Sequence, residues 1–274
     1  MVNDDGSDFQ LVTYNSRGRR KNPTKHNQNH ILTDSFSVDE IVSKVQAALE
    51  KFKESPFHRS LLSALKDSLV SLNKSTIVDI VCFGLGHFSD SIDSKYQLAA
   101  LLSIQATYSS NVYLYDPLFT KNEILSLKQL KLSVIDQNEE GRRRMNDCST
   151  LVFMPHCSKQ LTNNFLNANW SPSIHNCVLL GNSWSELECN TTNALLKQDV
   201  NFVYKLKEYA TEINLQNNFH YPNTFSGTSL HIFTEEKLST VPVGFWETNP
   251  TSPVIHSDPE LITAEEIPGN VELL

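Results

Sequence analysis

The sequence predicts an α/β protein with a Rossmann-like, mostly parallel, doubly wound sheet, two helices ahead of that sheet and a late edge strand. Short, continuous apolar runs alternate with segments of helical periodicity through the middle of the chain. Such runs are typical of parallel strands that are buried on both faces. The first run, Ile77–Phe83, ends at Gly84-Leu85-Gly86, and a helical segment follows at once. This pattern is how a buried strand turns into a helix whose N-terminus can hold an anion.

Two amphipathic helices are expected before the first strand. Ser37 stands three residues before Glu40, which is the spacing of a capping box, and apolar residues then recur at helical spacing as far as Phe52. A second helix follows Pro56 and carries a leucine stripe that ends at Leu72. Because both helices precede the sheet in the chain, we expect them to cover one of its faces.

The sheet is predicted from apolar runs that are separated by helices. The strands are expected at Ile77–Phe83, Val112–Tyr115, Leu132–Ile135, Thr150–Met154 and Cys177–Leu180. The intervening helices are expected at Ser91–Tyr108, Thr120–Leu130 and Ser158–Leu166. A helix over Val203–Gln216 and an antiparallel edge strand over Leu230–Phe233 are expected to complete the domain. Crossovers between parallel strands should be right-handed.

Composition divides the chain into one domain with two tails. We expect a single domain over residues 34–246, a mobile basic arm over 1–33 and a disordered acidic tail over 247–274. The basic run Ser16–Lys21 would serve as a nuclear-import or phosphate-contacting tag, or remain a solvated arm. The formal net charge of -8 argues against a protein that binds nucleic acid through a basic face.

Cysteine usage and hydropathy indicate a protein of the cytosol, the nucleus or both. The five cysteines are scattered and none forms a CxxC pair, which favours reduced thiols in an intracellular protein. No N-terminal apolar signal region occurs, and no apolar run reaches the ~20 residues that span a bilayer. We therefore expect no membrane partner.

The candidate binding site follows from the rule that open α/β sheets hold ligands at the carboxyl ends of their strands. Small or polar residues follow each of the five expected parallel strands. These candidates are Gly84, Gly86, Ser89, Asp116, Asn138, His156 and Asn182. We predict that they bind a nucleotide-like ligand, with S-adenosylmethionine as one candidate and haem as a less favoured one. The sequence assigns no catalytic residue and no metal site.

The glycine loop by itself leaves the ligand open. Ser89 stands where a dinucleotide fingerprint has its third glycine, and Asp116 lies farther on than the ribose-binding acid of that fingerprint. The same arrangement suits the adenosyl group of a methyl donor equally well. Alternatively, Gly84 and Gly86 only permit a tight turn, and Asp116 only ends a strand.

Two further pairs have a functional and a structural interpretation. His156 and Cys157 could form a nucleophile–base pair or bind a metal or haem. Side chains of adjacent residues rarely point to the same place, however, so a hydrogen-bonded structural histidine is favoured. Asn182 and Ser183 would bind a ligand or cap the next helix, and capping is favoured.

Taken in order, the residues at the strand ends resemble one known family. They include GLG, YDP, NEEG, HC and GNS. This ordered set is similar to the Sensitivity to Red Light Reduced (SRR-like) family, and the resemblance covers residues 9 to 235. Pro155 ahead of HC and the stretch Thr191–Asn218 depart from it. The resemblance implies a regulatory role in circadian clock input, clock-gene expression and haem biosynthesis, and it supplies no catalytic residue.

The sequence is therefore consistent with three functions. The first is a regulatory protein of the SRR-like family that works with protein partners the sequence does not identify. The second is an S-adenosylmethionine-dependent methyltransferase, in which Asp116 would take the ribose and Asn138, His156 and Asn182 would line the acceptor side. The third is a haem sensor that uses His156 or Cys157.

Overall fold

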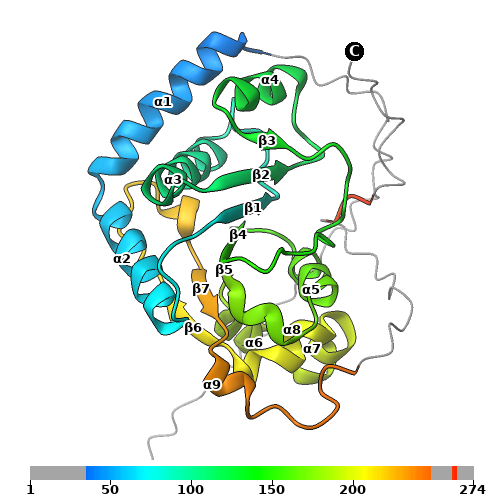
Figure 1. Ribbon diagram of the computed structural model, residues 1–274. Coiled ribbons are helices and arrows are strands. Elements are labelled where there is room, and N and C mark those ends of the chain that lie inside the picture. The colour runs from blue at the N-terminus through cyan, green and yellow to red at the C-terminus, as the bar shows by residue number, and fades with distance from the viewer. Residues whose placement is uncertain (1–34, 248–260, 264–274) are drawn as a thin grey trace, which may run out of the picture. The chain divides into compact units, whose positions relative to one another are not determined.

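A computed structural model describes residues 35–247 and 261–263 of the 274-residue chain (Figure 1). The expected basic arm and most of the expected acidic tail lie outside the described residues. The described chain forms a seven-stranded sheet of order β3-β2-β1-β4-β5-β7-β6, flanked by helices on both faces. The predicted α/β class with a mostly parallel, doubly wound sheet is therefore confirmed.

Five parallel strands form the greater part of the sheet. They are β1 (Asp79–Phe83), β2 (Asn111–Tyr115), β3 (Ser133–Val134), β4 (Thr150–Met154) and β5 (Cys177–Asn182). The strand order reverses between β1 and β4, because the chain continues from β1 outward through β2 and β3 and then returns to the other side of β1. This reversal is the topological switch point at which open α/β sheets bind ligands.

The last two strands correct the sequence prediction for this region. Val203–Gln216 is not one helix: a helix ends at Leu206, and β6 (Thr211–Asn214) follows. The late strand is present as β7 (Thr228–Ile232), antiparallel to both β5 and β6. It lies inside the sheet, and the missed β6 takes the edge position. Long-range pairing with β7 has overridden the local apolar spacing that favoured a helix.

Helices occupy both faces of the sheet. They are α1 (Val38–Glu54), α2 (Pro56–Ser71), α3 (Ile92–Tyr108), α4 (Lys121–Gln129), α5 (Lys159–Ala168), α6 (Trp184–Asn190), α7 (Asn193–Asp199), α8 (Asn201–Leu206) and α9 (Glu235–Leu238). The expected capping box of Ser37 and Glu40 is formed at α1. A second one joins Thr120 to Glu123 at α4.

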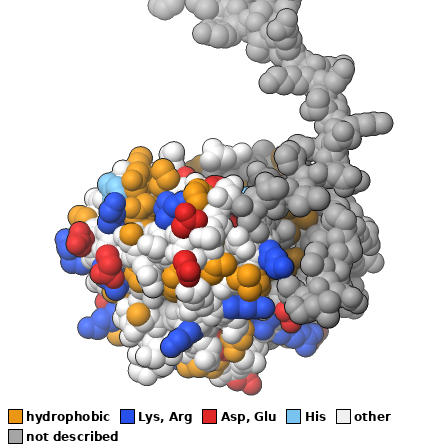
Figure 2. Space-filling view, turned by 90° about the horizontal axis from the view of Figure 1, so that it is seen from above, with side chains coloured by type: hydrophobic (Ala, Val, Ile, Leu, Met, Phe, Trp, Pro, Cys, Tyr) orange, Lys and Arg blue, Asp and Glu red, His pale blue; other side chains and the backbone are white. Residues whose placement is uncertain are grey.

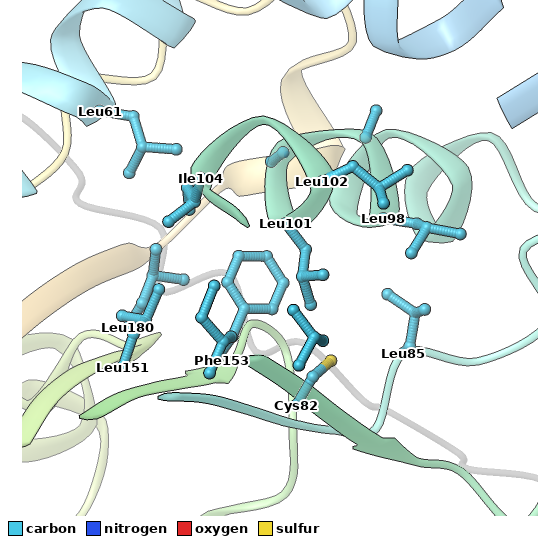
Figure 3. Packing of buried hydrophobic residues seen from close by; sticks show 14 of the residues in the cluster. Leu61, Cys82, Leu85, Leu98, Leu101, Leu102, Ile104, Leu151, Phe153 and Leu180 are labelled. Atoms are coloured by element: carbon cyan, nitrogen blue, oxygen red, sulfur yellow. The ribbon is translucent and has the colours of Figure 1, made fainter. Parts of the chain in front are cut away.

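One face of the sheet is sealed by α2 and α3, with α1 packed outside α3 and α4 (Figure 1). Figure 3 shows Leu98 and Leu101 of α3 above Cys82 of β1 and Phe153 of β4, all of them fully buried. Each such side chain contributes about 1.5–3 kcal/mol when it leaves water. The two helices before the sheet lie on this face, as expected.

The opposite face is covered by α5–α8 and, beside β1 and β2, by a segment that forms no helix. Between β3 and β4 the chain runs from Ile135 to Ser149 as loop and turns. This β3–β4 crossover packs against α5 at Gly141, where an added Cβ would lie 2.8 Å from the Leu161 carbonyl oxygen. The φ of Gly141 is +79°, a conformation that glycine adopts at no steric cost.

Charged side chains of both signs occur on the face that Figure 2 shows. Acidic and basic groups are interspersed on the face in Figure 2, so the described part of that face has no continuous basic field. Within residues 35–247 and 261–263, no helix combines the length and the apolar character that a membrane span requires.

Candidate functional site

A cavity of about 320 Å³ opens at the carboxyl ends of β1, β2 and β4, beside the switch point. The β1–α3 turn, the end of β2, the β3–β4 crossover and the start of α5 supply most of its walls. Its lining residues are Phe83, Gly84, Gly86, Tyr115, Asp116, Pro117, Leu118, Asn138, Gly141, His156, Cys157, Ser158, Leu161, Leu261 and Ile262.

The turn after β1 requires glycine for two separate reasons. Gly84 and Gly86 have φ values of +67° and +72°, which L side chains adopt only under strain. At Gly84 the space is also filled, because an added Cβ would lie 2.5 Å from the Cys157 sulfur atom. The turn therefore brings the main chain close to the β4–α5 turn, and this contact forms the floor of the cavity.

The buried Asp116 carboxylate holds the glycine turn in place. Its Oδ2 accepts a hydrogen bond from the Gly86 N–H at 2.7 Å, and its Oδ1 accepts one from the Leu118 N–H at 2.8 Å. Burial raises the pKa of the Asp116 carboxyl above its ordinary value, while the two N–H donors oppose that shift. One carboxylate thus joins the loops that follow β1 and β2.

Glu123 is a second buried carboxylate that joins two loops. This fully buried carboxylate accepts from the Ser89 N–H and the Thr120 N–H, both at 2.9 Å, and lies 3.2 Å from the His87 Nδ1. In the sequence, Glu123 stands three residues after Thr120, which is the spacing of a capping box and indicates only a local role. Its contact with Ser89, 34 residues earlier, has no local sequence signal.

Asn138 presents an amide donor to the cavity. Its Oδ1 accepts a hydrogen bond from the Glu140 N–H at 3.0 Å, which fixes the orientation of the side-chain amide. Its Nδ2 donates to the main-chain carbonyl of Ile262 at 2.8 Å. The β3–β4 crossover therefore supplies a fixed donor to whatever occupies the cavity.

His156 lies at the turn after β4, in the left-handed conformation with φ +58°. Asn182 supports this turn, since its Oδ1 accepts from the His156 N–H and its Nδ2 donates to the Cys157 carbonyl, each at 2.8 Å. The His156 Nε2 lies 3.0 Å from the Ser226 carbonyl. Because a carbonyl only accepts, Nε2 carries the proton in this contact, and Nδ1 of the neutral ring is an acceptor.

Cys157 is a packed thiol and has no features of a nucleophile. Its sulfur donates to the Phe83 carbonyl at 3.2 Å, and burial raises the pKa of the thiol far above its ordinary value. No cluster of three or more His, Cys, Asp or Glu residues that could hold a metal occurs in the described part of the chain.

The structure places five of the seven candidate residues on the cavity wall, namely Gly84, Gly86, Asp116, Asn138 and His156. Ser89 and Asn182 lie behind it, where they brace the wall through the contacts above. The cap of α6 is Ser183, whose Oγ accepts from the Glu186 N–H at 3.1 Å. Sequence reasoning did not place the apolar wall residues Leu118 and Leu161 in the site.

A second cavity of about 320 Å³ lies on the same face of the sheet but toward the amino ends of β1, β2 and β4. Its lining includes Val81, Tyr113, Glu139, Arg143 and Thr150. The Arg143 guanidinium lies 5.1 Å from the centre of the Tyr113 ring and pairs with Glu139 at 2.9 Å. The β3–β4 crossover therefore contributes to both cavities.

Comparison with known proteins identifies related chains. The sequence model of the SRR1 domain matches residues 45–232. A mouse SRR1-like protein is 33% identical over 153 residues, which cover 54% of this chain and 61% of that protein. A Drosophila SRR1-like protein is 27% identical over 274 residues, which cover 97% of this chain and 96% of that protein. The Arabidopsis Protein SENSITIVITY TO RED LIGHT REDUCED 1 is 26% identical over 263 residues, which cover 85% of this chain and 92% of that protein.

Two solved structures are distantly similar. MtNAS in complex with MTA and tNA aligns with a TM-score of 0.39 and 12% identity over 72% of this chain and 70% of that chain. The plantazolicin methyltransferase BpumL aligns with a TM-score of 0.35 and 12% identity over 72% of this chain and 98% of that chain. Likenesses this distant carry no argument about function, and the fold class rests on the strand order.

Proposed function

Because the chain belongs to the SRR1 domain family, we propose that it is a regulatory protein that binds a small adenosyl-type ligand at the carboxyl edge of its sheet. The cavity at the switch point carries this proposal. Its volume of about 320 Å³ lies at the lower end of the range typical of small-molecule sites. Apolar walls, one carboxylate and one amide donor face the same space.

The hydrogen bonds of the glycine turn favour an uncharged nucleoside or a cation over a dinucleotide. The Gly86 and Ser89 N–H groups, which would otherwise face phosphate oxygens, already donate to Asp116 and Glu123. A pyrophosphate would have to displace a carboxylate and would meet its negative charge. Asp116 instead repels anions and attracts hydroxyl donors or a positive sulfonium group.

Asp116 retains capacity for a ribose. An ionised carboxylate has about four lone-pair sites, and two of them accept the Gly86 and Leu118 N–H groups. The remaining sites suit the two hydroxyls of a ribose. Leu118 and Leu161 would contact the flat face of an adenine ring, and Asn138 would donate to an acceptor on the ligand.

Methyl transfer is the second candidate function, and the position of His156 favours it. Its Nε2 donates to Ser226, so Nδ1 of the neutral ring is an acceptor in a residue that lines the cavity. In such a reaction the methyl group would leave the sulfonium for a nucleophilic atom of the acceptor, and Nδ1 would take the proton of that atom. Orientation of the two substrates would supply much of the rate enhancement.

Haem sensing has the weakest support of the three. The raised pKa of Cys157 disfavours a thiolate ligand, and the thiol donates inward to Phe83. His156 already uses Nε2 in its contact with Ser226. A haem that bound here would have to take Nδ1 or break that contact.

We also propose the cellular role that the family resemblance implies. That role is in circadian clock input, clock-gene expression and the regulation of haem biosynthesis, carried out in the cytosol or nucleus with protein partners. The name of the Arabidopsis relative refers to red-light sensitivity. Removing this protein from its cell should alter the amplitude of rhythmic transcripts, and an unchanged rhythm and unchanged haem level would contradict the role.

Ligand-dependent melting tests the binding proposal. S-adenosylmethionine, S-adenosylhomocysteine, NAD⁺ and haem are titrated separately against the full chain. A ligand at 100 times its dissociation constant stabilises the folded state by about 2.7 kcal/mol, or roughly 5 to 10 °C in melting temperature. We expect this shift with S-adenosylmethionine and S-adenosylhomocysteine and not with NAD⁺. Asn138→Asp, which keeps the acceptor for Glu140 and loses the donor, should weaken it. A shift with NAD⁺ alone, or with no ligand, would contradict the proposal.

A further inference from the structure

The segment Leu261–Thr263 lies in the candidate site although it is far from the site in sequence. It is the short red segment beside the carboxyl ends of the strands in Figure 1. Leu261 and Ile262 both line the cavity formed by the glycine turn, Asp116, Asn138 and His156. Part of the cavity wall is therefore a piece of the chain that follows the whole α/β domain.

A specific hydrogen bond fixes the segment at the site. The Ile262 carbonyl accepts from the Asn138 Nδ2 at 2.8 Å, and the Glu140 N–H holds the other end of the same amide. Asn138 therefore recognises a main-chain carbonyl, as it would in a bound peptide. Leu261 and Ile262 add apolar side chains to a wall that already contains Leu118 and Leu161.

We propose that Leu261–Thr263 is an intrachain occupant of the cavity that competes with the small-molecule ligand. The inference rests on the proposed function, because the segment uses the same Asn138 donor and apolar wall that are assigned to the ligand. One of the two N–H groups of the Asn138 Nδ2 donates to the Ile262 carbonyl, so a ligand acceptor that takes this N–H excludes the carbonyl from it. A ligand that fills the apolar space must also displace Leu261 and Ile262.

Competition of this kind lowers the apparent affinity of the ligand. The dissociation constant is multiplied by one plus the docking equilibrium constant of the segment, because only the undocked fraction is competent to bind. A tethered segment docks at a high effective concentration although its own contacts are few. With two apolar side chains and one hydrogen bond, we expect docking to weaken ligand binding by roughly three- to tenfold.

The test uses the full chain with the double substitution Leu261→Asp and Ile262→Asp. Two carboxylates would be disfavoured in an apolar wall next to Asp116, so the segment should leave the cavity. Val243→Asp is the matched control, since Val243 is fully exposed and does not line the cavity. Neither change touches the core, so all three proteins should fold alike.

Two readouts separate this inference from the proposed function. The first is hydrogen–deuterium exchange without ligand over residues 84–88, 138–141 and 156–158. Exchange there should be faster in the double variant than in the wild type or Val243→Asp. The second is calorimetric titration with S-adenosylhomocysteine, which should bind the double variant three- to tenfold more tightly.

The outcomes divide cleanly. Equal exchange in all three proteins would overturn the docking of the segment. Faster exchange with an unchanged dissociation constant would overturn the competition. Faster exchange in the double variant, with no S-adenosylhomocysteine binding by any protein, would support docking of the segment and contradict the adenosyl ligand of the proposed function.

Discussion

On one face of the sheet, α2 and α3 pack apolar side chains against the central strands, whereas on the other the β3–β4 crossover passes β1 and β2 without forming a helix. The first face has Leu98, Leu101 and Phe153 with no exposed surface. The second has cavities toward both ends of the strands, and the crossover contributes to their walls. The difference indicates that the site arises where the helical layer is incomplete.

The largest expected effect contrasts one aromatic residue from each face. Phe153→Ala removes a ring from the sealed face and should lower the free energy of unfolding by about 3–5 kcal/mol. Tyr113→Ala on the crossover side removes a half-buried ring that contacts Arg143, and it should cost about 1 kcal/mol or less. Urea denaturation measures both changes. Equal losses would show that the two faces are packed alike.

The glycine turn gives the next largest effect. Gly84→Ala combines backbone strain at φ +67° with overlap of the new Cβ and the Cys157 sulfur, and it should cost about 3 kcal/mol. Gly181→Ala is the control, because a Cβ there would lie at an ordinary 3.5 Å from the Met154 carbonyl oxygen. Combining Gly84→Ala with Cys157→Ala should recover the part of the loss that is due to overlap. No recovery would assign the whole loss to strain.

A buried imidazole on the crossover side predicts a dependence of stability on pH. Burial lowers the pKa of His231 to about 4, against the opposing effects of Glu212 and of the Leu179 main chain. The unfolded chain takes up a proton near pH 6.5 and the folded chain only near pH 4. Stability due to this group is therefore complete above pH 6.5 and declines as the pH falls toward 4.

The expected size of this decline is about 2.5 kcal/mol between pH 7.5 and pH 4.5. His231 stacks on Trp184, with ring centres 4.3 Å apart, so His231→Phe keeps an aromatic ring in that place. Denaturation at several pH values should give a flatter curve for His231→Phe than for the wild type. Parallel curves would mean that other groups cause the loss.

The smallest effect concerns Asp116, whose carboxylate holds the glycine turn in place. Asp116→Asn keeps one acceptor oxygen but turns an NH₂ group toward either the Gly86 or the Leu118 N–H, and it should cost about 1–2 kcal/mol. The exposed Asp147 offers the control substitution Asp147→Asn. If thermal unfolding shows the same stability for both variants, Asp116 does not hold the turn in the way described.

Much of the fold could be predicted because its signals are local. β1, β4 and β5 are continuous apolar runs, and a parallel sheet places their carboxyl ends at one edge. The convergence of Gly84, Asp116, Asn138 and His156 on one cavity follows from that topology. The resemblance to the SRR-like family is carried by residues at the same strand ends, and the SRR1 domain model matches residues 45–232.

The remaining features depend on contacts between distant parts of the chain. β6 is four residues long, is partly exposed and pairs with β7, and its sequence lacks the alternation of a half-buried strand. The contact of Glu123 with Ser89 joins two loops, although only the local capping box of Glu123 is visible in sequence. The sequence around Leu261 and Ile262 has no pattern that indicates a cavity wall.

A crystal structure of the full chain with S-adenosylhomocysteine tests the central claim most directly. The account predicts electron density for the adenosyl group within the cavity lined by Gly84, Gly86, Asp116 and Asn138, with the Ile262 carbonyl displaced from the Asn138 Nδ2. An empty cavity at saturating ligand, with Ile262 still bound to Asn138, would contradict the account.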